Sequence, residues 1–577
     1  MLTSRIALTL ATTALLTALS GGTASAQFGP PGQRPGGGGF GPGPGGMGPN
    51  RADLQLVELF DENEDGWLNQ DERDTARAFL EAGGRQGGGR GRGPWGGRGG
   101  AQLAPTPGPQ VTPDEVANYP DAELYDTSVL RTVFLQFESD DWEEELETFK
   151  DTDVEVTAQV TVDGKTYDNV GVHFRGQSSY FMMPRGVKRS LNVSFAAIDK
   201  EQRLYGYKTL NLLNCAGDRS LMSAVLYSHI ARKYIPAPRA NFVKVVINGE
   251  YWGVYANVQQ FDKVFLAENY EPAEGTRWKA PGNPGADGGL RYLGESLEGY
   301  KSRFDMKSND GEKAWEALVE LCRTLNQTPT DKLHDEVAEV LDIDTALKFL
   351  ALDVALVNSD GYWTRASDYY LFRDAEGVFH VAPHDMNEAF HGSRPGPPGG
   401  RGGNRGGPRQ VGGSGRGDRT SPTRFDPPQE FGPPEGFGPP EGFGPPPGEF
   451  GPPRGFGPPP GFGPPGRGGP GEGGVELDPL VGLDNDRMPL RSRLLAVPQL
   501  REQYLADVRR IASESLDWDE LGPFVESQRK LIADAVKQET RSRSSYDDFE
   551  AAVAELRDFA EKRSEFLLQA VEPTDAK

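Results

Sequence analysis

Three aspartates between residues 353 and 391 stand beside apolar segments rather than on an obvious solvated face. Asp360 follows a predicted helix, and Asp368 and Asp385 flank two short predicted strands, YYLF and VFHVA. A polar turn at 374–377 joins these strands, which predicts a β-hairpin whose first and last residues lie at the same end. Clustered carboxylates repel one another unless a cation lies between them, and hard oxygen ligands suit Mg²⁺. The alternative is that these residues are ordinary helix-cap and turn aspartates.

A second set of oxygen-bearing residues lies near the N-terminus, in DENEDGWLNQDE, residues 61–72. This segment fits the calcium-binding loop of an EF-hand, with a short helical pattern on either side of it within residues 51–82. Gly66 permits the sharp turn at the sixth position of such a loop. The predicted Ca²⁺ ligands are side-chain oxygens of Asp61, Asn63, Asp65, Asn69 and Glu72 and the carbonyl oxygen of Trp67. An acidic surface loop is the alternative, and the sequence offers no second hand to pair with this one.

The elements that must position the three aspartates begin with a strand-rich region. Alternating apolar residues predict one hairpin in 154–176, turned at Asp163-Gly164, and another in 242–259, turned at Asn248-Gly249. SLNVSF predicts a further strand between them. Residues 126–300 are therefore expected to form a sheet-rich lobe.

Helices are expected to make up most of the rest. Asp218 and Ser220, in GDRS, are interpreted as the cap of one main helix running to about Lys233. Apolar residues three and four apart predict further helices in 311–358 and again in 476–572. These two sets should pack together as one helical lobe.

Glycine and proline are concentrated in tracts that cannot build a packed core. The 577 residues include 75 Gly and 47 Pro. The tracts are residues 27–50, a Gly/Arg-rich linker at 83–110, and an insertion with repeated FGPP units at 393–474. Such composition predicts disorder. The net charge of −24 argues against nucleic acid as a partner, because phosphate binding needs a basic face.

Residues 1–26 are typical of a secretory signal peptide, with Arg5 before an apolar run and small residues at the cleavage site. The mature chain is expected to begin near Gln27, outside the cytoplasm: periplasmic, at the cell surface or extracellular. No later stretch predicts a transmembrane anchor. Cys215 and Cys322 can form one disulfide or remain as two buried free thiols, and the sequence favours neither alternative.

A series of motifs runs through the chain in a fixed order: GVHFRGQSS, KRSLNVSF, LNLLNCAGDRSLM, NGEYWGVYANVQQFDKVFL, RWKAPG, FDMKSND, NSDGYW, DYYLF and PHDMNEAF. Taken in this order, they resemble those of the CotH kinase family, secreted kinase-like proteins named for a spore coat protein. The resemblance covers about residues 126–570, in a first part at 126–392 and a C-terminal helical part at 475–572. It implies an α+β, two-lobed atypical protein-kinase fold with a β-rich N-lobe and a helical C-lobe.

The resemblance implies transfer of the γ-phosphoryl group of ATP to serine or threonine of an extracytoplasmic protein, or of the chain itself. The usual HRD, DFG and Gly-rich kinase signatures are absent from the sequence. Phosphoryl transfer needs a metal ion on the phosphates, here Mg²⁺ or Mn²⁺, a nearby cation, and a carboxylate that orients the hydroxyl. By position in the family pattern, the catalytic residue is Asp360, the metal ligands are Asp385, Asp368 and Asn387, and the nucleotide contacts are Arg175, Ser178, Ser179, Lys188 and Lys279.

Departures from the family pattern keep a second function open. Asp368 stands where many members have asparagine, and Gln259 where many have a glutamate that would pair with the phosphate-holding lysine. His384 replaces a common aromatic residue, and a packed histidine is favoured over a group that supports the metal. These changes favour a catalytically inactive, calcium-binding surface scaffold, whereas Asp360 and Asp385 favour the enzyme. A structural calcium-binding matrix protein would leave the series of motifs unexplained.

Overall fold

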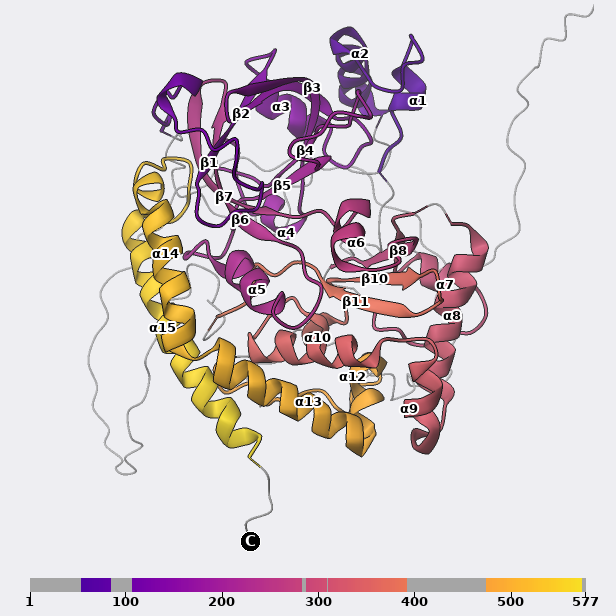
Figure 1. Ribbon diagram of the computed structural model, residues 1–577. Coiled ribbons are helices and arrows are strands. Elements are labelled where there is room, and N and C mark those ends of the chain that lie inside the picture. Colours follow the sequence, from indigo (N-terminus) through magenta and orange to yellow (C-terminus); the bar gives the residue numbers. More distant parts are fainter. Residues whose placement is uncertain (1–52, 85–105, 283–286, 309, 392–473, 573–577) are drawn as a thin grey trace, which may run out of the picture. The chain divides into compact units, whose positions relative to one another are not determined.

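The computed structural model describes residues 53–84, 106–282, 287–308, 310–391 and 474–572 (Figure 1). They form a closed seven-stranded barrel, a second sheet of four strands, and helices. The predicted signal peptide, 1–26, and the tract 27–50 lie outside the described residues. So do residues 85–105 of the tract 83–110 and residues 393–473 of the tract 393–474.

The barrel confirms both hairpins predicted in the strand-rich region. Its strands are β1 Arg131–Phe137, β2 Val156–Val162, β3 Lys165–Phe174, β4 Leu191–Ser194, β5 Thr209–Leu213, β6 Ala240–Ile247 and β7 Glu250–Val258. β2 pairs with β3 and β6 with β7, both antiparallel. Positive φ at Asn248 (48°) and Gly249 (81°) is typical of a two-residue hairpin turn. A parallel pairing of β1 with β6 closes the ring.

The second sheet contains the hairpin predicted around the aspartates. Its order is β11-β10-β8-β9, with β8 Gly275–Ala280, β9 Asp305–Met306, β10 Tyr369–Asp374 and β11 Phe379–Pro383. β10 pairs antiparallel with β11, which confirms the hairpin. On its other side β10 pairs with β8, where Tyr370 lies opposite Lys279. This pairing brings Lys279 to the sheet that carries the aspartates.

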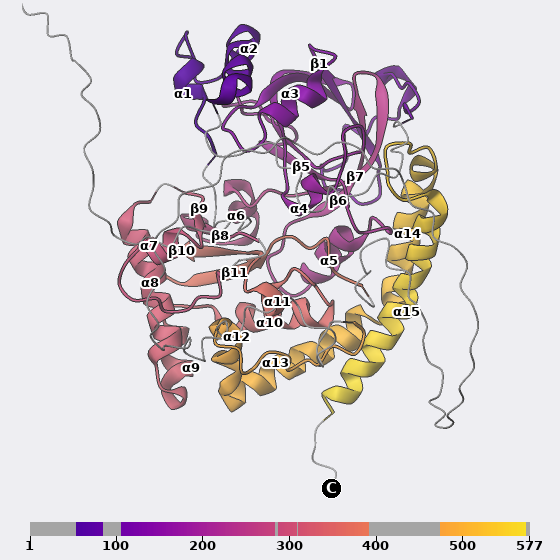
Figure 2. The ribbon, with the colours of Figure 1, turned by 180° about the vertical axis from the view of Figure 1, so that it is seen from behind.

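The helices of 311–358 and 476–572 share one hydrophobic core, as predicted. α10 packs against α13, and α14 lies beside α15 in both views (Figures 1 and 2). The longer helices are α2 Gln70–Phe79, α3 Trp142–Thr148, α5 Ser223–Ala231, α6 Lys263–Asn269, α8 Glu312–Gln327, α9 Thr330–Ala338, α10 Ile343–Ala355, α13 Pro498–Arg510, α14 Trp518–Lys537 and α15 Tyr546–Ala570. The shorter ones are α1 Val57–Phe60, α4 Ser178–Phe181, α7 Glu298–Lys301, α11 Tyr362–Arg365 and α12 Pro489–Ser492. Short 3₁₀ or π segments are η1 Leu80–Gly84, η2 Pro113–Glu115, η3 Leu494–Ala496 and η4 Ile511–Ser515.

Two expectations about local features are settled by the structure. Asp218 accepts a hydrogen bond from the backbone N–H of Ser223, the first residue of α5, at 2.8 Å, which confirms that its side chain caps the helix, although Met222 occupies the N-cap position. Cys215 and Cys322 are both free and buried, so the disulfide alternative is wrong. Within the described part of the chain, no helix combines the length and apolar composition needed to span a bilayer.

The folded region begins earlier than the predicted boundary near Asp126. Backbone N–H of Gly108 donates to Glu250 Oε1 at 2.7 Å, and Val111 N–H donates to the carbonyl of Gly249 at 2.9 Å. The end of the predicted linker therefore lies along the β6–β7 turn. Sequence composition did not reveal this, because Gly and Pro mark flexible linkers and extended edge segments alike.

The helix–loop–helix of residues 57–79 packs directly on the barrel and shares its core. Leu56, Leu68 and Ala76 are buried together with the inward-facing residues of the barrel strands. Arg73 of α2 and Glu145 of α3 form an ion pair at 2.8 Å, with both side chains 2% exposed. A ligand that stabilised this helix–loop–helix would therefore stabilise the barrel with it.

His380 connects the β10–β11 hairpin to the start of α10 and makes stability depend on pH. Its ring nitrogens lie 3.2 Å from Asp342 and 2.8 Å from Asp374. Burial opposes the charged ring, but the hydrogen bonds to the two aspartates outweigh it and raise the pKa of His380 above 6.5. Burial likewise opposes ionisation of Asp342, yet hydrogen bonds from His380 and Thr345 lower its pKa to about 2.

We expect the free energy of unfolding to fall as pH rises past neutrality. A raised histidine pKa stabilises the fold fully below the unfolded pKa near 6.5, and this contribution is lost as pH passes the folded pKa. Urea unfolding between about pH 5 and 8 measures it. His380→Gln should flatten the slope, whereas His334→Gln, at an exposed histidine beside Asp335, should not. An identical slope in His380→Gln would contradict this account.

Candidate active site

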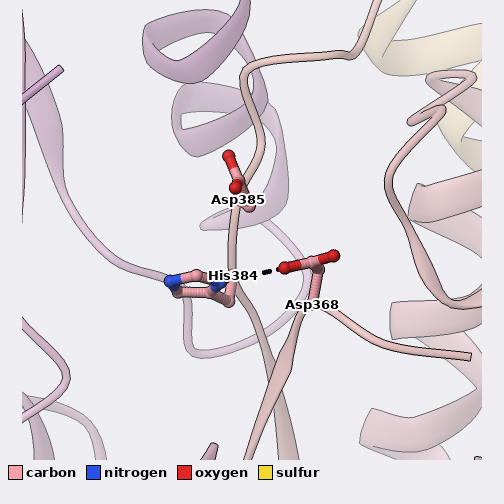
Figure 3. Close-up of side chains that lie close together, drawn as sticks. All are labelled: Asp368, His384 and Asp385. Atoms are coloured by element: carbon pink, nitrogen blue, oxygen red, sulfur yellow. Dashed lines mark ion pairs between the residues drawn. The ribbon is translucent and has the colours of Figure 1, made fainter. Parts of the chain in front are cut away.

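The two ends of the β10–β11 hairpin bring Asp368, His384 and Asp385 together (Figure 3). Each offers a ligand atom, and these atoms lie within 4.8 Å of one another. His384 Nδ1 lies 3.5 Å from Asp368 Oδ1. Among the described residues this is the one such group of three or more acidic, histidine or cysteine side chains. The hairpin thus brings Asp368 and Asp385 into the arrangement that its geometry predicted.

Both aspartates adopt unusual backbone conformations. Asp368 has φ 60° and Asp385 has φ 50°, in the left-handed region that residues other than glycine rarely occupy. Such conformations persist only where the surrounding structure imposes them, and they gather at functional sites. The strain is consistent with a hairpin end shaped to hold two carboxylates close together.

Burial and mutual repulsion hold the aspartates toward their neutral forms. Burial raises the pKa of Asp368 to about 6. Burial and then the charge of Asp368 raise the pKa of Asp385. Burial, followed by the charges of Glu388 and Asp385, raises the pKa of Asp360. A divalent cation among these carboxylates would reverse the shifts, because an adjacent positive charge favours ionisation.

Lys279 and Arg175 are close enough to these carboxylates to interact with them electrostatically. Burial and then the charge of Arg175 lower the pKa of Lys279 to about 8, while Asp368 and Asp385 oppose that shift. Burial also lowers the pKa of Arg175, which Tyr370 and Asp385 oppose. Two half-buried cations beside a carboxylate group suit a ligand that carries both phosphate and metal.

The loop that carries Asp360 lies beside the segment that follows β11. Asp360 Oδ1 is 2.5 Å from Arg365 Nη1, and Ser359 N–H donates to the carbonyl of Glu388 at 3.1 Å. Neither Arg365 nor Glu388 is among the site residues predicted from sequence. Glu388 stands three residues after Asp385 in PHDMNEAF, and this spacing could have marked it as a neighbour.

The oxygen and nitrogen donors fit a divalent metal ion. Asn387 Oδ1 is buried and accepts no hydrogen bond from the described residues, so it is free to ligate. Burial and the charge of Lys279 lower the pKa of His384 well below 6.5, which leaves its ring neutral. A neutral imidazole suits Mn²⁺ better than Mg²⁺, whereas the carboxylates suit either. His384, favoured from sequence as a packed residue, therefore lies where it could bind the metal.

A small cavity adjoins the group. It encloses about 70 Å³, enough for a phosphate group but far less than a whole nucleotide, which would extend beyond it. Its lining includes Arg175, Gly176, Ser179, Tyr370, Asp385 and Asn387. Gly176 has φ 86°, and a Cβ there would lie 2.3 Å from Ser179 Oγ. Ser178 begins α4, and its side chain lies outside the described structure.

Lys188, predicted to contact the nucleotide, instead forms an ion pair elsewhere in the structure. Its Nζ lies 2.9 Å from Glu539 Oε2 and donates to the carbonyl of Val254 at 2.8 Å. It is not among the described residues that line the cavity. Gln259 does line the cavity, but it accepts from Arg239 N–H and donates to Glu268. Lys188 therefore forms its ion pair with Glu539, and Gln259 is not its partner.

The predicted calcium loop is held by its own backbone amides. Asp61 accepts hydrogen bonds from Asp65 and Gly66, the second at 2.7 Å. Glu72 accepts from Glu62 at 3.0 Å and from Asn69 at 2.8 Å. Asn69 also caps α2. These bonds curl the loop on itself, and its acidic side chains do not form a group as tight as that around Asp368.

Known proteins are similar to the part of the chain that contains the hairpin. The family model described as CotH kinase protein matches residues 172–423 and 482–567, more than half of the chain. Inner spore coat protein H of Bacillus subtilis (strain 168) is 28% identical over 171 residues, 27% of this chain and 44% of that protein. Invasin CotH3 of Rhizopus delemar is 26% identical over 161 residues, 25% of this chain and 26% of that protein. The match thus spans less than half the length of either relative.

Proposed function

The chain belongs to the CotH kinase family, and from this membership we propose that it is an exported serine/threonine protein kinase. It transfers the γ-phosphoryl group of ATP to an extracytoplasmic or surface protein, the chain itself included. Export is supported by the signal-like residues 1–26 and by relatives named as a spore coat protein and an invasin. The observation that carries the proposal is the carboxylate group of Asp368 and Asp385 with Lys279 and Arg175 beside it.

The proposed roles follow from the chemistry of phosphoryl transfer. Asp368, Asp385 and Asn387, with His384, would hold Mg²⁺ or Mn²⁺, which neutralises the charge of the phosphates. Lys279 and Arg175 bind phosphate oxygens at the edge of the carboxylate group. Asp360 orients the attacking hydroxyl and accepts its proton. In this arrangement the cations and carboxylates bind the metal and the phosphates and hold the attacking hydroxyl in position. Binding and positioning are most of what phosphoryl transfer requires.

Phosphate transfer from labelled ATP by the mature chain tests the proposal. The assay contains Mg²⁺ or Mn²⁺ and a general acceptor protein, and Asp360→Ala is run beside the parent. Label that the parent incorporates and the variant does not would support the kinase. Absence of label in the parent under all metal conditions would overturn it.

A catalytically inactive scaffold is the second candidate function, and it is favoured by particular residues. Gln259 lacks a carboxylate, and Lys188 is held by Glu539 away from the cavity. If ATP with Mn²⁺ raises the melting temperature but no label is incorporated, the nucleotide-binding scaffold is the better account. If ATP neither binds nor reacts, membership of the CotH kinase family indicates the fold of this chain but not a kinase activity.

We further propose that the loop of residues 61–72 binds Ca²⁺ and that binding stabilises the barrel. Calorimetric titration of the mature chain should give a heat that Glu72→Gln abolishes. Glu64→Gln is the matched control, because it removes the same charge at the fourth loop position, which supplies no ligand. At about 100 times the dissociation constant, Ca²⁺ should add about 2.7 kcal/mol to the free energy of unfolding. Equal heats in both variants would contradict the site.

A further inference from the structure

A buried aspartate outside the metal group, Asp353, organises the loop that carries Asp360. It lies in the last turn of α10 and is 2% exposed. Its Oδ1 accepts hydrogen bonds from Asn358 Nδ2 at 3.0 Å and from the Tyr227 hydroxyl at 3.2 Å. Its Oδ2 accepts from the backbone N–H of Tyr362 at 2.7 Å. The carboxylate thus binds residues on both sides of Asp360.

The backbone at the end of α10 adds a second constraint. Asn358 N–H donates to the carbonyl of Asp353 at 2.9 Å, and Val357 N–H donates to that of Val354 at 3.2 Å. This is the double hydrogen bond of a Schellman cap, in which glycine usually takes the left-handed position. Here that position is Val357, with φ 51°. A β-branched residue there is strained, so the contacts that follow must hold the turn in place.

The loop also wraps tightly around the Asp353 carboxylate. A Cβ on Gly361 would lie 2.2 Å from Asp353 Oδ2, so no larger residue fits while the carboxylate is in place. Asn358 Nδ2, which donates to Asp353, also lies 3.5 Å from the backbone carbonyl of Asp385. Through Asn358 the same carboxylate is connected to the segment that holds the proposed metal ligand.

We propose that Asp353 is a positioning residue that fixes the loop 357–362, and with it Asp360, relative to Asp385. The inference rests on the proposed kinase function for its consequence, but the positioning itself is a property of the folded chain. Asn358 passes the position of the carboxylate to the 384–391 segment, whereas the Tyr227 hydroxyl of α5 makes only the longest hydrogen bond to the carboxylate.

Two measurements on Asp353→Asn in the mature chain test the positioning. Hydrogen exchange by mass spectrometry should show faster exchange in residues 357–366 and unchanged protection in the hairpin 369–383. Labelled-ATP kinetics should show kcat reduced about 30- to 100-fold with KM for ATP within about twofold, since misplacing a catalytic group by about 1 Å costs this much. Tyr227→Phe is the matched control, because it removes only the longest hydrogen bond to the same buried carboxylate, and it should lower kcat less than about threefold.

A double variant separates positioning from a merely structural role. If Asp353 acts through Asp360, adding Asp353→Asn to Asp360→Ala should not lower the residual rate further. Additive losses, or equal losses in Asp353→Asn and Tyr227→Phe that follow the melting temperature, would overturn the inference. Unchanged exchange in 357–366 would overturn it even if the parent has no kinase activity. Faster exchange in an inactive parent would support the positioning and refute only the proposed function.

Discussion

Asp385→Ala is expected to lower phosphate transfer by about 10³-fold or more, the largest effect on activity of any single change considered. The charges of Asp368, Lys279 and Arg175 all shift the pKa of Asp385, so this carboxyl interacts with both signs of charge at the site. In the proposed mechanism its loss would remove a metal ligand, and with the metal the neutralisation of phosphate charge that Lys279 and Arg175 alone do not supply. Asp385→Asn keeps the shape but not the charge, and it should be nearly as inactive. Initial rates with labelled ATP at saturating Mn²⁺ measure the effect.

The matched control for this prediction lies at the other end of the same hairpin. Asp374→Asn changes an aspartate that binds His380 and the turn rather than the metal group, so it should retain most of the activity. Full activity in Asp385→Ala would remove Asp385 from the mechanism.

Glu539→Ala is expected to destabilise the fold by about 3–5 kcal/mol, because it leaves a buried charge without its partner. The side chains of Lys188 and Glu539 are 4% and 2% exposed. Glu539 Oε1 also accepts from Val254 N–H at 2.7 Å. Gly253 permits this approach, since a Cβ there would lie 2.9 Å from Glu539 Cδ. Urea unfolding of the mature chain measures the loss.

Removing both charges should cost less than removing one. In Lys188→Met with Glu539→Gln, the amide oxygen can still accept from Val254 N–H and no buried charge remains, so more than half of the stability should return. The control is Glu555→Ala, which breaks the Arg219 pair whose side chains are 46% and 67% exposed. That change should cost no more than about 1 kcal/mol. Equal losses in Glu539→Ala and Glu555→Ala would contradict the burial argument.

The pKa values of the carboxyls at the site depend on burial in the folded chain. For this reason the sequence alone did not decide between an active enzyme and an inactive scaffold. The types and order of residues predicted that Asp360 or Asp368 would lie near Asp385, but they did not predict that burial raises the pKa of all three carboxyls. In the proposed mechanism a bound cation would favour the ionised form of Asp360, which is the form that accepts a proton.

Short-range patterns were sufficient for the elements that bring the aspartates together. The turn at Asn248-Gly249, the cap at Asp218 and the hairpin 369–383 all depend on residues within a few positions of one another. Local backbone preference and a two-residue side-chain period determine such features. Asp368 and Asp385 meet for the same reason, because they flank one hairpin.

Contacts between distant segments were decided only by tertiary structure. The parallel pairing of β1 with β6 closes the barrel, and the pairing of β8 with β10 brings Lys279 to Tyr370. Lys188 meets Glu539, 351 positions away in the chain. By itself the sequence determined the local elements and the family, and it predicted which residues bind metal and phosphate. Which of them meet depended on which surfaces are buried against each other, and neither propensity nor spacing along the chain encodes that choice.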